Sequence, residues 1–313
     1  MRTSLKGRDL VSLHDLGSDE IASILDEADA LKRRHRQRSE EPYLPLAGRN
    51  LAMIFQKPSL RTRVSFEAGM YRYGGHAVYL GPEDIQLGKR ETTADIARTL
   101  SRYCDAIMAR TFAHQHVVEL AQHATVPVVN GLSDRLHPCQ VLADLMTLRE
   151  RKGRLAGIKL AFLGDGNNCA HSLLYGCAKT GVHLSLAVPE GYEPLADIVT
   201  EAREDARESG AELQVTHDRD HALDGADAIY TDVWASMGQE SEKQVRAAAM
   251  RPYQLDAEAL SKAKPDAIVL HCLPAHRGEE ISDEVIEGPR SVVFDEAENR
   301  LHAQMALLIS LIS

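Results

Sequence analysis

The sequence of 313 residues has few aromatic residues, few cysteines and no long apolar run. No stretch approaches the roughly 18 apolar residues that a membrane-spanning helix needs, and no apolar segment of a secretory signal follows the first residues. The five cysteines form no C-x-x-C pair and no regular framework, so we expect reduced thiols and no disulfide scaffold. These absences predict a cytoplasmic protein without a membrane segment.

An excess of positive charge is also absent. Lys and Arg number 36 against 46 Asp and Glu, which gives a formal net charge of −10. This balance argues against nucleic-acid binding as the main function, so an anion site would have to be local. With 44% hydrophobic and 26% charged residues the composition is that of a globular protein, and the length favours two domains.

Short apolar runs alternate with helical patterns along the chain. Strands are predicted at 51–55, 76–80, 106–110, 126–130, 159–163, 183–188, 213–216, 228–233, 267–270 and 292–294. Helices are predicted at 18–36, 61–73, from about 92, and at 114–123, 138–151, 168–180, 194–209, 282–287 and 301–312. Ser18-Asp19-Glu20 is expected to cap the first of them. Strands joined by crossover helices imply parallel sheets that are covered on both faces.

A polar, glycine-punctuated stretch at 150–157 marks a boundary between two such series. We therefore predict an α/β fold of two doubly wound parallel-sheet domains, residues 1–150 and 151–297. The final helix, at about 298–313, is expected to return to the first domain because it must bury an apolar face. Ligands of open parallel sheets bind beyond the carboxyl ends of the strands, so the loops there carry the candidate sites.

The loop after the first strand combines hydrogen-bond donors with the start of a helix. Ser59 and Thr62 supply hydroxyl groups and Arg61 supplies a guanidinium, beside the unpaired N–H groups of the helix N-terminus. This density favours a phosphate or carboxylate site over an ordinary helix cap. Arg110, at the end of a later strand, is a candidate partner for the same anion, although an arginine there is often only solvated.

A second candidate is the segment His137-Pro138-Cys139-Gln140, which opens a helix. A neutral His137 imidazole there can donate a hydrogen bond to a carbonyl oxygen that develops negative charge. Zinc binding by His137 with Cys139 is the rival, and it lacks a second ligand pair at metal spacing. A purely structural cap is the other alternative.

The turn 164–168 resembles a dinucleotide-binding turn only in part. Cys169 replaces the third glycine, and no acidic residue ends the next strand, so a nicotinamide site is weakly supported. Asn167 or Asn168 is instead a candidate for holding a small zwitterion. After later strands, Asp232 is suited to a substrate ammonium, and Cys272 is either a buried filler or a site group.

Taken together, these segments resemble the aspartate/ornithine carbamoyltransferase family. Ser59-Leu60-Arg61-Thr62 is similar to its S-T-R-T loop, with Leu60 where Thr is usual, and residues 137–140 are similar to its H-P-x-Q element. Asp232, Ser236-Met237-Gly238-Gln239 and His271-Cys272-Leu273-Pro274 favour the ornithine branch. The basic pair Lys89-Arg90 alone does not exclude the aspartate branch.

The resemblance implies an active site in the cleft between the domains, a homotrimer or a multiple of trimers, and no cofactor or metal. It implies carbamoyl transfer to the side-chain amine of L-ornithine, in arginine metabolism; another amine acceptor and a catalytically silent subunit are the alternatives. Its carbamoyl-phosphate set is Ser59, Leu60, Arg61, Thr62, Gln86 (from a neighbouring subunit), Arg110, His137, Gln140, Cys272, Leu273 and Arg300. Its ornithine set is Asn168, Asp232, Ser236 and Met237, with Arg110, His137 and Cys272 expected to be catalytic.

Overall fold

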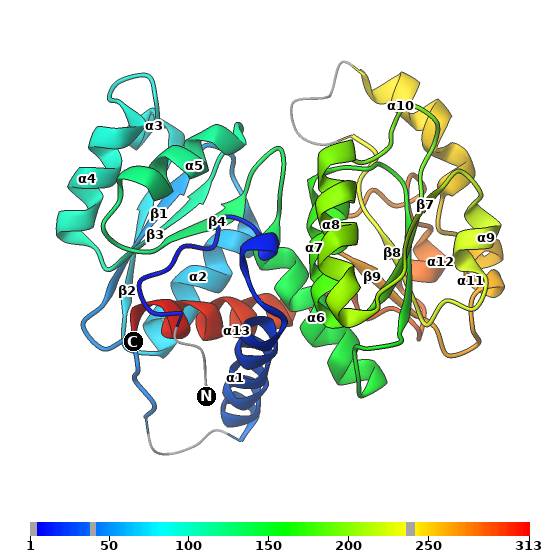
Figure 1. The fold of residues 1–313 in the computed structure, drawn as a ribbon, viewed down its shortest axis with the longest axis horizontal. Helices are drawn as coiled ribbons and strands as arrows, with labels where there is room; N and C mark the ends of the chain where they lie inside the picture. The colour runs from blue at the N-terminus through cyan, green and yellow to red at the C-terminus, as the bar shows by residue number, and fades with distance from the viewer. Residues whose placement is uncertain (1–4, 38–41, 236–241) are drawn as a thin grey trace. The chain divides into compact units, whose positions relative to one another are not determined.

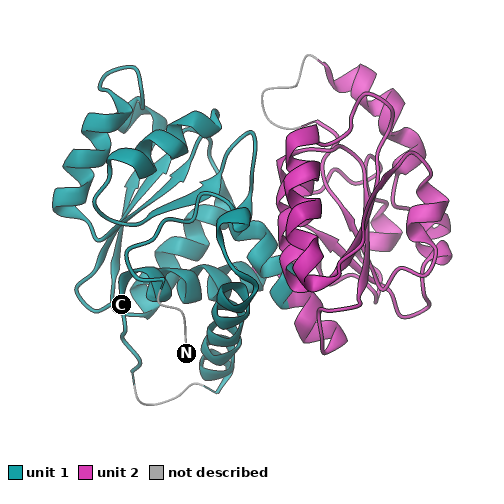
Figure 2. Ribbon diagram, viewed as in Figure 1, with its two compact units in different colours: residues 1–146, 298–313 teal, residues 147–297 magenta. Residues whose placement is uncertain are grey.

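The computed structural model describes residues 5–37, 42–235 and 242–313 (Figure 1). The chain divides into two compact units, called unit 1 (residues 1–146 and 298–313) and unit 2 (residues 147–297) (Figure 2). Each unit contains one sheet in which every pairing is parallel. The prediction of two α/β units with parallel sheets is therefore confirmed. Among the described residues, no helix has both the length and the apolar character needed to span a membrane.

Unit 1 contains a four-stranded sheet in the order β2-β1-β3-β4. Its strands are β1 (Asn50–Phe55), β2 (His76–Leu80), β3 (Ala106–Arg110) and β4 (Val128–Leu132). Its helices are α1 (Ser18–Arg36), α2 (Leu60–Arg72), α3 (Pro82–Ile85), α4 (Thr93–Tyr103), α5 (His114–His123) and the first part of α6 (Pro138–Lys152), with the short 3-10 helix η1 (Leu13–Asp15). One face of the sheet forms an apolar core with α4 and α5. Phe55 and Arg110 are paired in register, so the loops after β1 and β3 start at the same edge.

The last helix, α13 (Val293–Ile312), packs against unit 1 through its C-terminal part, as the sequence predicted. Gly69 of α2 is the point of close approach. A Cβ atom at that position would lie 2.5 Å from the Met305 sulfur, which is closer than van der Waals contact allows. A glycine is therefore required there for α2 and α13 to pack as they do.

Unit 2 contains a five-stranded sheet in the order β7-β6-β5-β8-β9. Its strands are β5 (Lys159–Leu163), β6 (His183–Ala187), β7 (Leu213–Thr216), β8 (Ala228–Thr231) and β9 (Ile268–His271). Its helices are α7 (Asn168–Thr180), α8 (Ala196–Ser209), α9 (Arg219–Leu223), α10 (Lys243–Met250), α11 (Ala257–Lys262) and α12 (Asp283–Ile286), with the 3-10 helix η3 (Arg251–Tyr253). Figure 1 shows α7 and α8 on one face of this sheet and α9, α11 and α12 on the other.

The central strands of unit 2 end together. Leu163, Thr231 and His271 are the last residues of β5, β8 and β9, and they are aligned in register. The loops that follow them therefore start at one edge of the sheet, where chemistry was expected.

Two local predictions were wrong. Residues 292–294 do not form a strand, because α13 begins at Val293; strand-like pairing is limited to an isolated bridge between Ser291 and Val269. The Val-Val-Phe triplet has high β-propensity, but a sheet needs a longer run, and the acidic residues after it suit the first turn of a helix. Ser18 is not the cap of α1: Gly17 takes that position, and its N–H donates to the Glu20 carboxylate at 2.9 Å.

Candidate active site

The N-terminus of α2 is organised by two hydroxyl groups. Ser59 caps the helix by accepting a hydrogen bond from the Thr62 N–H at 3.3 Å, and its hydroxyl donates to Thr62 Oγ1 at 3.1 Å. Leu60 is the first residue of the helix, and its side chain is 74% exposed. The leucine that replaces the usual threonine is thus not packed within the unit, and its main-chain N–H stays at the helix start.

Arg300 is the centre of a buried hydrogen-bond network in unit 1. Its guanidinium donates to Gln140 Oε1 at 2.6 Å, to Thr62 Oγ1 at 3.2 Å and to Gln304 Oε1 at 2.8 Å. Gln304 in turn donates to Ser65 Oγ at 2.7 Å. Arg300 is almost fully buried, so the network fixes the side chains of Thr62 and Gln140. The sequence-predicted residues Thr62, Gln140 and Arg300 are therefore brought together by α13.

His137 lies in a strongly positive environment. Burial, together with the charges of Arg300, Arg110 and Arg61, holds the pKa of His137 well below its usual value of 6.5. The imidazole is therefore neutral at physiological pH, and it can donate one hydrogen bond. His137 precedes the first residue of α6, Pro138, as the sequence predicted. Three guanidinium groups around a neutral imidazole form a site suited to a bound anion and a polarised carbonyl oxygen.

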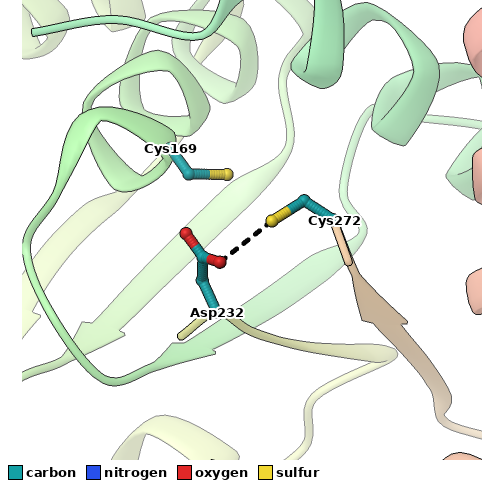
Figure 3. A group of neighbouring side chains, drawn as sticks. All are labelled: Cys169, Asp232 and Cys272. Carbon is teal, nitrogen blue, oxygen red and sulfur yellow. Dashed lines mark hydrogen bonds between the residues drawn. The ribbon is translucent and has the colours of Figure 1, made fainter. Parts of the chain in front are cut away.

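Asp232 is the centre of a polar cluster in unit 2, shown in Figure 3 with Cys169 and Cys272. Its carboxylate accepts a hydrogen bond from Cys272 Sγ at 2.9 Å and one from Asn167 Nδ2 at 2.8 Å. Asn167 also caps α7, because its Oδ1 accepts from the N–H groups of Cys169 and Ala170. The cluster thus joins the loops after β5, β8 and β9.

The Cys272 thiol is protonated. Hydrogen bonding with the Cys169 thiol, burial and the negative charge of Asp232 raise the pKa of Cys272 well above its usual value of 9.0. A covalent role as a thiolate nucleophile is therefore disfavoured. His271 is not its partner either, because the His271 ring lies 3.0 Å from Glu280 Oε1 and accepts from the Leu273 N–H at 2.8 Å. The Cys272 thiol instead orients Asp232.

Of the two candidate asparagines, Asn167 donates to Asp232. The structure also adds Asp165 and Arg246, which the sequence analysis did not name. Asp165 pairs with Arg246 of α10 at 3.0 Å, and burial, opposed by this arginine, raises the pKa of Asp165 to about 6. Arg246 also donates to the main-chain oxygen of Trp234. The Gly-Asp-Gly turn signals a role for Asp165, but no local signal links it to an arginine 81 residues away.

Gln86 directly follows α3 and has a left-handed backbone, φ 44°, in a loop of unit 1. Ser236 and Met237 lie outside the described residues.

Comparison with known proteins matches both units. The family model described as the aspartate/ornithine carbamoyltransferase carbamoyl-P binding domain matches residues 8–150, and that of the Asp/Orn binding domain matches residues 156–311. An ornithine carbamoyltransferase of Anoxybacillus flavithermus is 54% identical over 308 residues, covering 98% of both chains. The anabolic ornithine carbamoyltransferase of Pyrococcus furiosus is 54% identical over 308 residues, covering 98% of this chain and 97% of the relative.

Solved structures give the same result. Ornithine carbamoyltransferase from Pyrococcus furiosus superposes with a TM-score of 0.96 at 53% identity, covering 99% of this chain and 98% of the other. The enzyme from Gloeobacter violaceus superposes with a TM-score of 0.88 at 47% identity, covering 99% and 100%. With both family models matched and relatives this similar along nearly its whole length, the chain belongs to the aspartate/ornithine carbamoyltransferase family.

Proposed function

We propose that this chain transfers the carbamoyl group of carbamoyl phosphate to the side-chain amine of L-ornithine, giving L-citrulline and phosphate. The observation that carries the proposal is identity above 50%, along nearly the whole chain, to proteins named ornithine carbamoyltransferase. One of these relatives is named anabolic, which supports a place in arginine biosynthesis. The polar side chains around His137 and Arg300 in unit 1, and those around Asp232 in unit 2, are suited to the chemistry of this reaction.

Unit 1 provides the groups for carbamoyl phosphate. The N-terminus of α2, the Ser59 and Thr62 hydroxyls, and the guanidiniums of Arg61 and Arg110 suit the phosphate. Arg300 acts through Thr62 and Gln140, which it holds in place. The family resemblance adds Leu60 through its main chain, Gln86 from a neighbouring subunit, and Cys272 and Leu273.

The neutral His137 and the positive charge around it act on the carbonyl group. In the reaction, the amine nitrogen forms a bond to the carbonyl carbon and loses a proton, and the carbon–oxygen bond to phosphate breaks. Phosphate leaves with the electron pair of that bond. A hydrogen bond from His137 stabilises the carbonyl oxygen as it becomes negative, while Arg61 and Arg110 stabilise the leaving phosphate.

Unit 2 provides the groups for the amino acid. The nucleophile must be a neutral amine, whereas an alkylammonium has a pKa of about 10.4 in water. Positive potential near the amine favours its deprotonation. Asp232, held by Asn167 and Cys272, is suited to an ammonium group of the amino acid, and the family resemblance assigns Asn168, Ser236 and Met237 to the same substrate.

The test is an assay of carbamoyl phosphate with a panel of amines, read as product identity by mass spectrometry. We expect citrulline from L-ornithine and at least about 100-fold lower rates with aspartate, putrescine or N-acetylornithine, because a site built for one set of polar groups leaves them unpaired with another. A comparable rate with any of these amines would refute ornithine as the acceptor.

We also infer that the active form is a homotrimer or a multiple of trimers. An exposed apolar stripe on α2, made of Leu60, Val64 and Tyr71, supports an interface with another copy. Tyr71 is 85% exposed, more than any other large apolar side chain described as exposed. A cytoplasmic location likewise stays a prediction from the sequence.

A further inference from the structure

Two thiols flank Asp232 in unit 2, and the proposed reaction uses only one of them (Figure 3). Cys169 is the second residue of α7, which follows β5, and Cys272 directly follows β9. Strands β5 and β9 lie on either side of β8, whose end precedes Asp232. The two sulfur atoms and a carboxylate oxygen of Asp232 all lie within 4.8 Å of one another.

We propose that Cys169 and Cys272 form an oxidation site, at which a peroxide converts the two thiols into a reversible disulfide. Both cysteines are free thiols in the structure. The chemical step is local to unit 2 and needs no substrate. Its effect on activity rests on the proposed function, because Asp232 belongs to the proposed ornithine site and Cys272, whose thiol donates to Asp232, belongs to the proposed carbamoyl-phosphate set.

The separation of the sulfur atoms is compatible with bond formation. A disulfide has a sulfur–sulfur distance of about 2.0 Å, so sulfurs within 4.8 Å must approach by less than about 3 Å. Figure 3 shows both side chains directed toward the space above Asp232. Each sulfur is carried by a single rotatable Cα–Cβ bond, which lets it move toward the other.

Burial sets the order of the two steps. Cys272 is a partly exposed residue, whereas Cys169 is only 1% exposed. The Cys272 sulfur therefore attacks the peroxide first, giving a sulfenic acid and one water molecule. The Cys169 sulfur then displaces the hydroxyl from that sulfenic acid, which forms the disulfide and releases a second water. Two thiols are oxidised and one peroxide is reduced, so the step is balanced.

The reaction is expected to be slow. A carboxylate 2.9 Å from Cys272 Sγ disfavours the thiolate, which is the reactive form. The site therefore responds to sustained oxidant and does not act as a rapid sensor. Once formed, the disulfide removes the thiol that donates to Asp232 and joins α7 to the end of β9. Both changes alter the surroundings of the Asp232 carboxylate, which is proposed to bind the substrate amino acid.

The experiment treats the full chain with hydrogen peroxide, blocks the remaining thiols with N-ethylmaleimide, and digests it without reductant for mass spectrometry. We expect a peptide pair linked through Cys169 and Cys272, with the loss of two hydrogen atoms. Saturating ornithine should slow its formation. Carbamoyl transfer should fall by at least about tenfold as the link forms, and dithiothreitol should restore it.

Two variants make the test specific. Cys169→Ser should keep the activity of the reduced chain and form no linked peptide pair. Peroxide should leave its Cys272 as a sulfenic acid or a more oxidised product. Cys104→Ser, which removes a half-buried thiol in unit 1, should behave like the unmodified chain. Oxidation of Cys272 in the unmodified chain without a link to Cys169, or a loss of its activity that dithiothreitol reverses without any linked peptide pair, would overturn the proposal. A reduced chain without carbamoyl-transfer activity would refute the proposed function and leave the peptide link as an independent result.

Discussion

Arg300 Nη1 lies 2.6 Å from Gln140 Oε1, although 160 residues separate the two in the sequence. The same guanidinium holds Thr62 at the start of α2, and Gln304 holds the guanidinium. Arg300 thus places two side chains of the proposed carbamoyl-phosphate site at once. Gln304, one turn further along α13, is a positioning residue for that site.

Replacing Gln304 tests this network without touching a proposed ligand contact. Gln304→Ala removes an acceptor from Arg300 and a donor from Ser65, so we expect a loss of about 1–3 kcal/mol in the free energy of unfolding. The KM for carbamoyl phosphate should also rise, and Gln304→Glu, which keeps the acceptor, should restore most of it. A change in stability with an unaltered KM in Gln304→Ala would contradict the positioning role.

Arg61 and Arg63 form a matched pair for testing the anion site. Loss of a bidentate guanidinium–phosphate contact should weaken carbamoyl-phosphate binding by about 100-fold in Arg61→Ala, measured by calorimetry. Arg63 lies on the same helix but pairs with Glu67 at 3.1 Å and stacks on Tyr79, so Arg63→Ala should retain the affinity. Equal affinities in the two variants would remove Arg61 from the site.

The neutral state of His137 predicts a pH dependence of stability. Below pH of about 6.5 the unfolded chain binds a proton at this imidazole, whereas the folded chain does not, because its pKa is lowered. Stability should therefore fall as the pH drops through 6.5, with a contribution of up to about 1.4 kcal/mol per pH unit. Urea denaturation of His137→Gln between pH 7.5 and 5 should show a shallower fall. The exposed His76→Gln is the comparison, and an equal change in both variants would contradict the assignment.

The contact between α2 and α13 predicts a steric effect. Gly69→Ala places a Cβ atom against Met305, and overpacking of this kind costs about 1–3 kcal/mol. Because the clash involves a flexible side chain, Met305→Ala in the same chain should relieve it. The double variant should then be less destabilised than the sum of the two single variants. Additive losses in thermal or urea denaturation would show that the two residues do not clash.

The exposed stripe on α2 predicts how the chain assembles. A charge at its most exposed residue, as in Tyr71→Glu, should lower the mass measured by analytical ultracentrifugation from that of a trimer toward that of a monomer, because burying an unpaired charge is costly. Val245→Glu is the control, since Val245 is 70% exposed on α10 of unit 2. An unchanged mass in Tyr71→Glu would place the interface elsewhere.

Much of the architecture could be predicted because the strands are short apolar runs between clear turn signals. Parallel pairing then brings the strand ends to one edge, which is why Asp232 and Cys272 could be placed together before any contact was known. The positive charges around His137 were harder to predict from the sequence. These charges include Arg300, which is so far from Arg61 along the chain that no local sequence pattern indicates that the two lie near the same histidine.

Other features depend on choices that no pattern in the sequence decides. Asn167 and Asn168 are chemically identical, and only the helix start determines which one caps α7 and contacts Asp232. The pairing of Asp165 with Arg246 joins the loop after β5 to helix α10 through tertiary packing. The closeness of Cys169 to Cys272 arises in the same way, since a cysteine that follows a glycine-rich turn is by itself only a small apolar residue.

The division of unit 1 between residues 1–146 and 298–313 has a consequence for synthesis. Chains emerge from the ribosome N-terminus first, and domains fold as they appear. The sheet and the start of α2 are synthesised long before α13. Thr62 and Gln140 therefore lack their hydrogen bonds from Arg300 until unit 2 has been translated. A nascent chain, or one shortened by a late stop codon, would therefore lack part of the proposed carbamoyl-phosphate site.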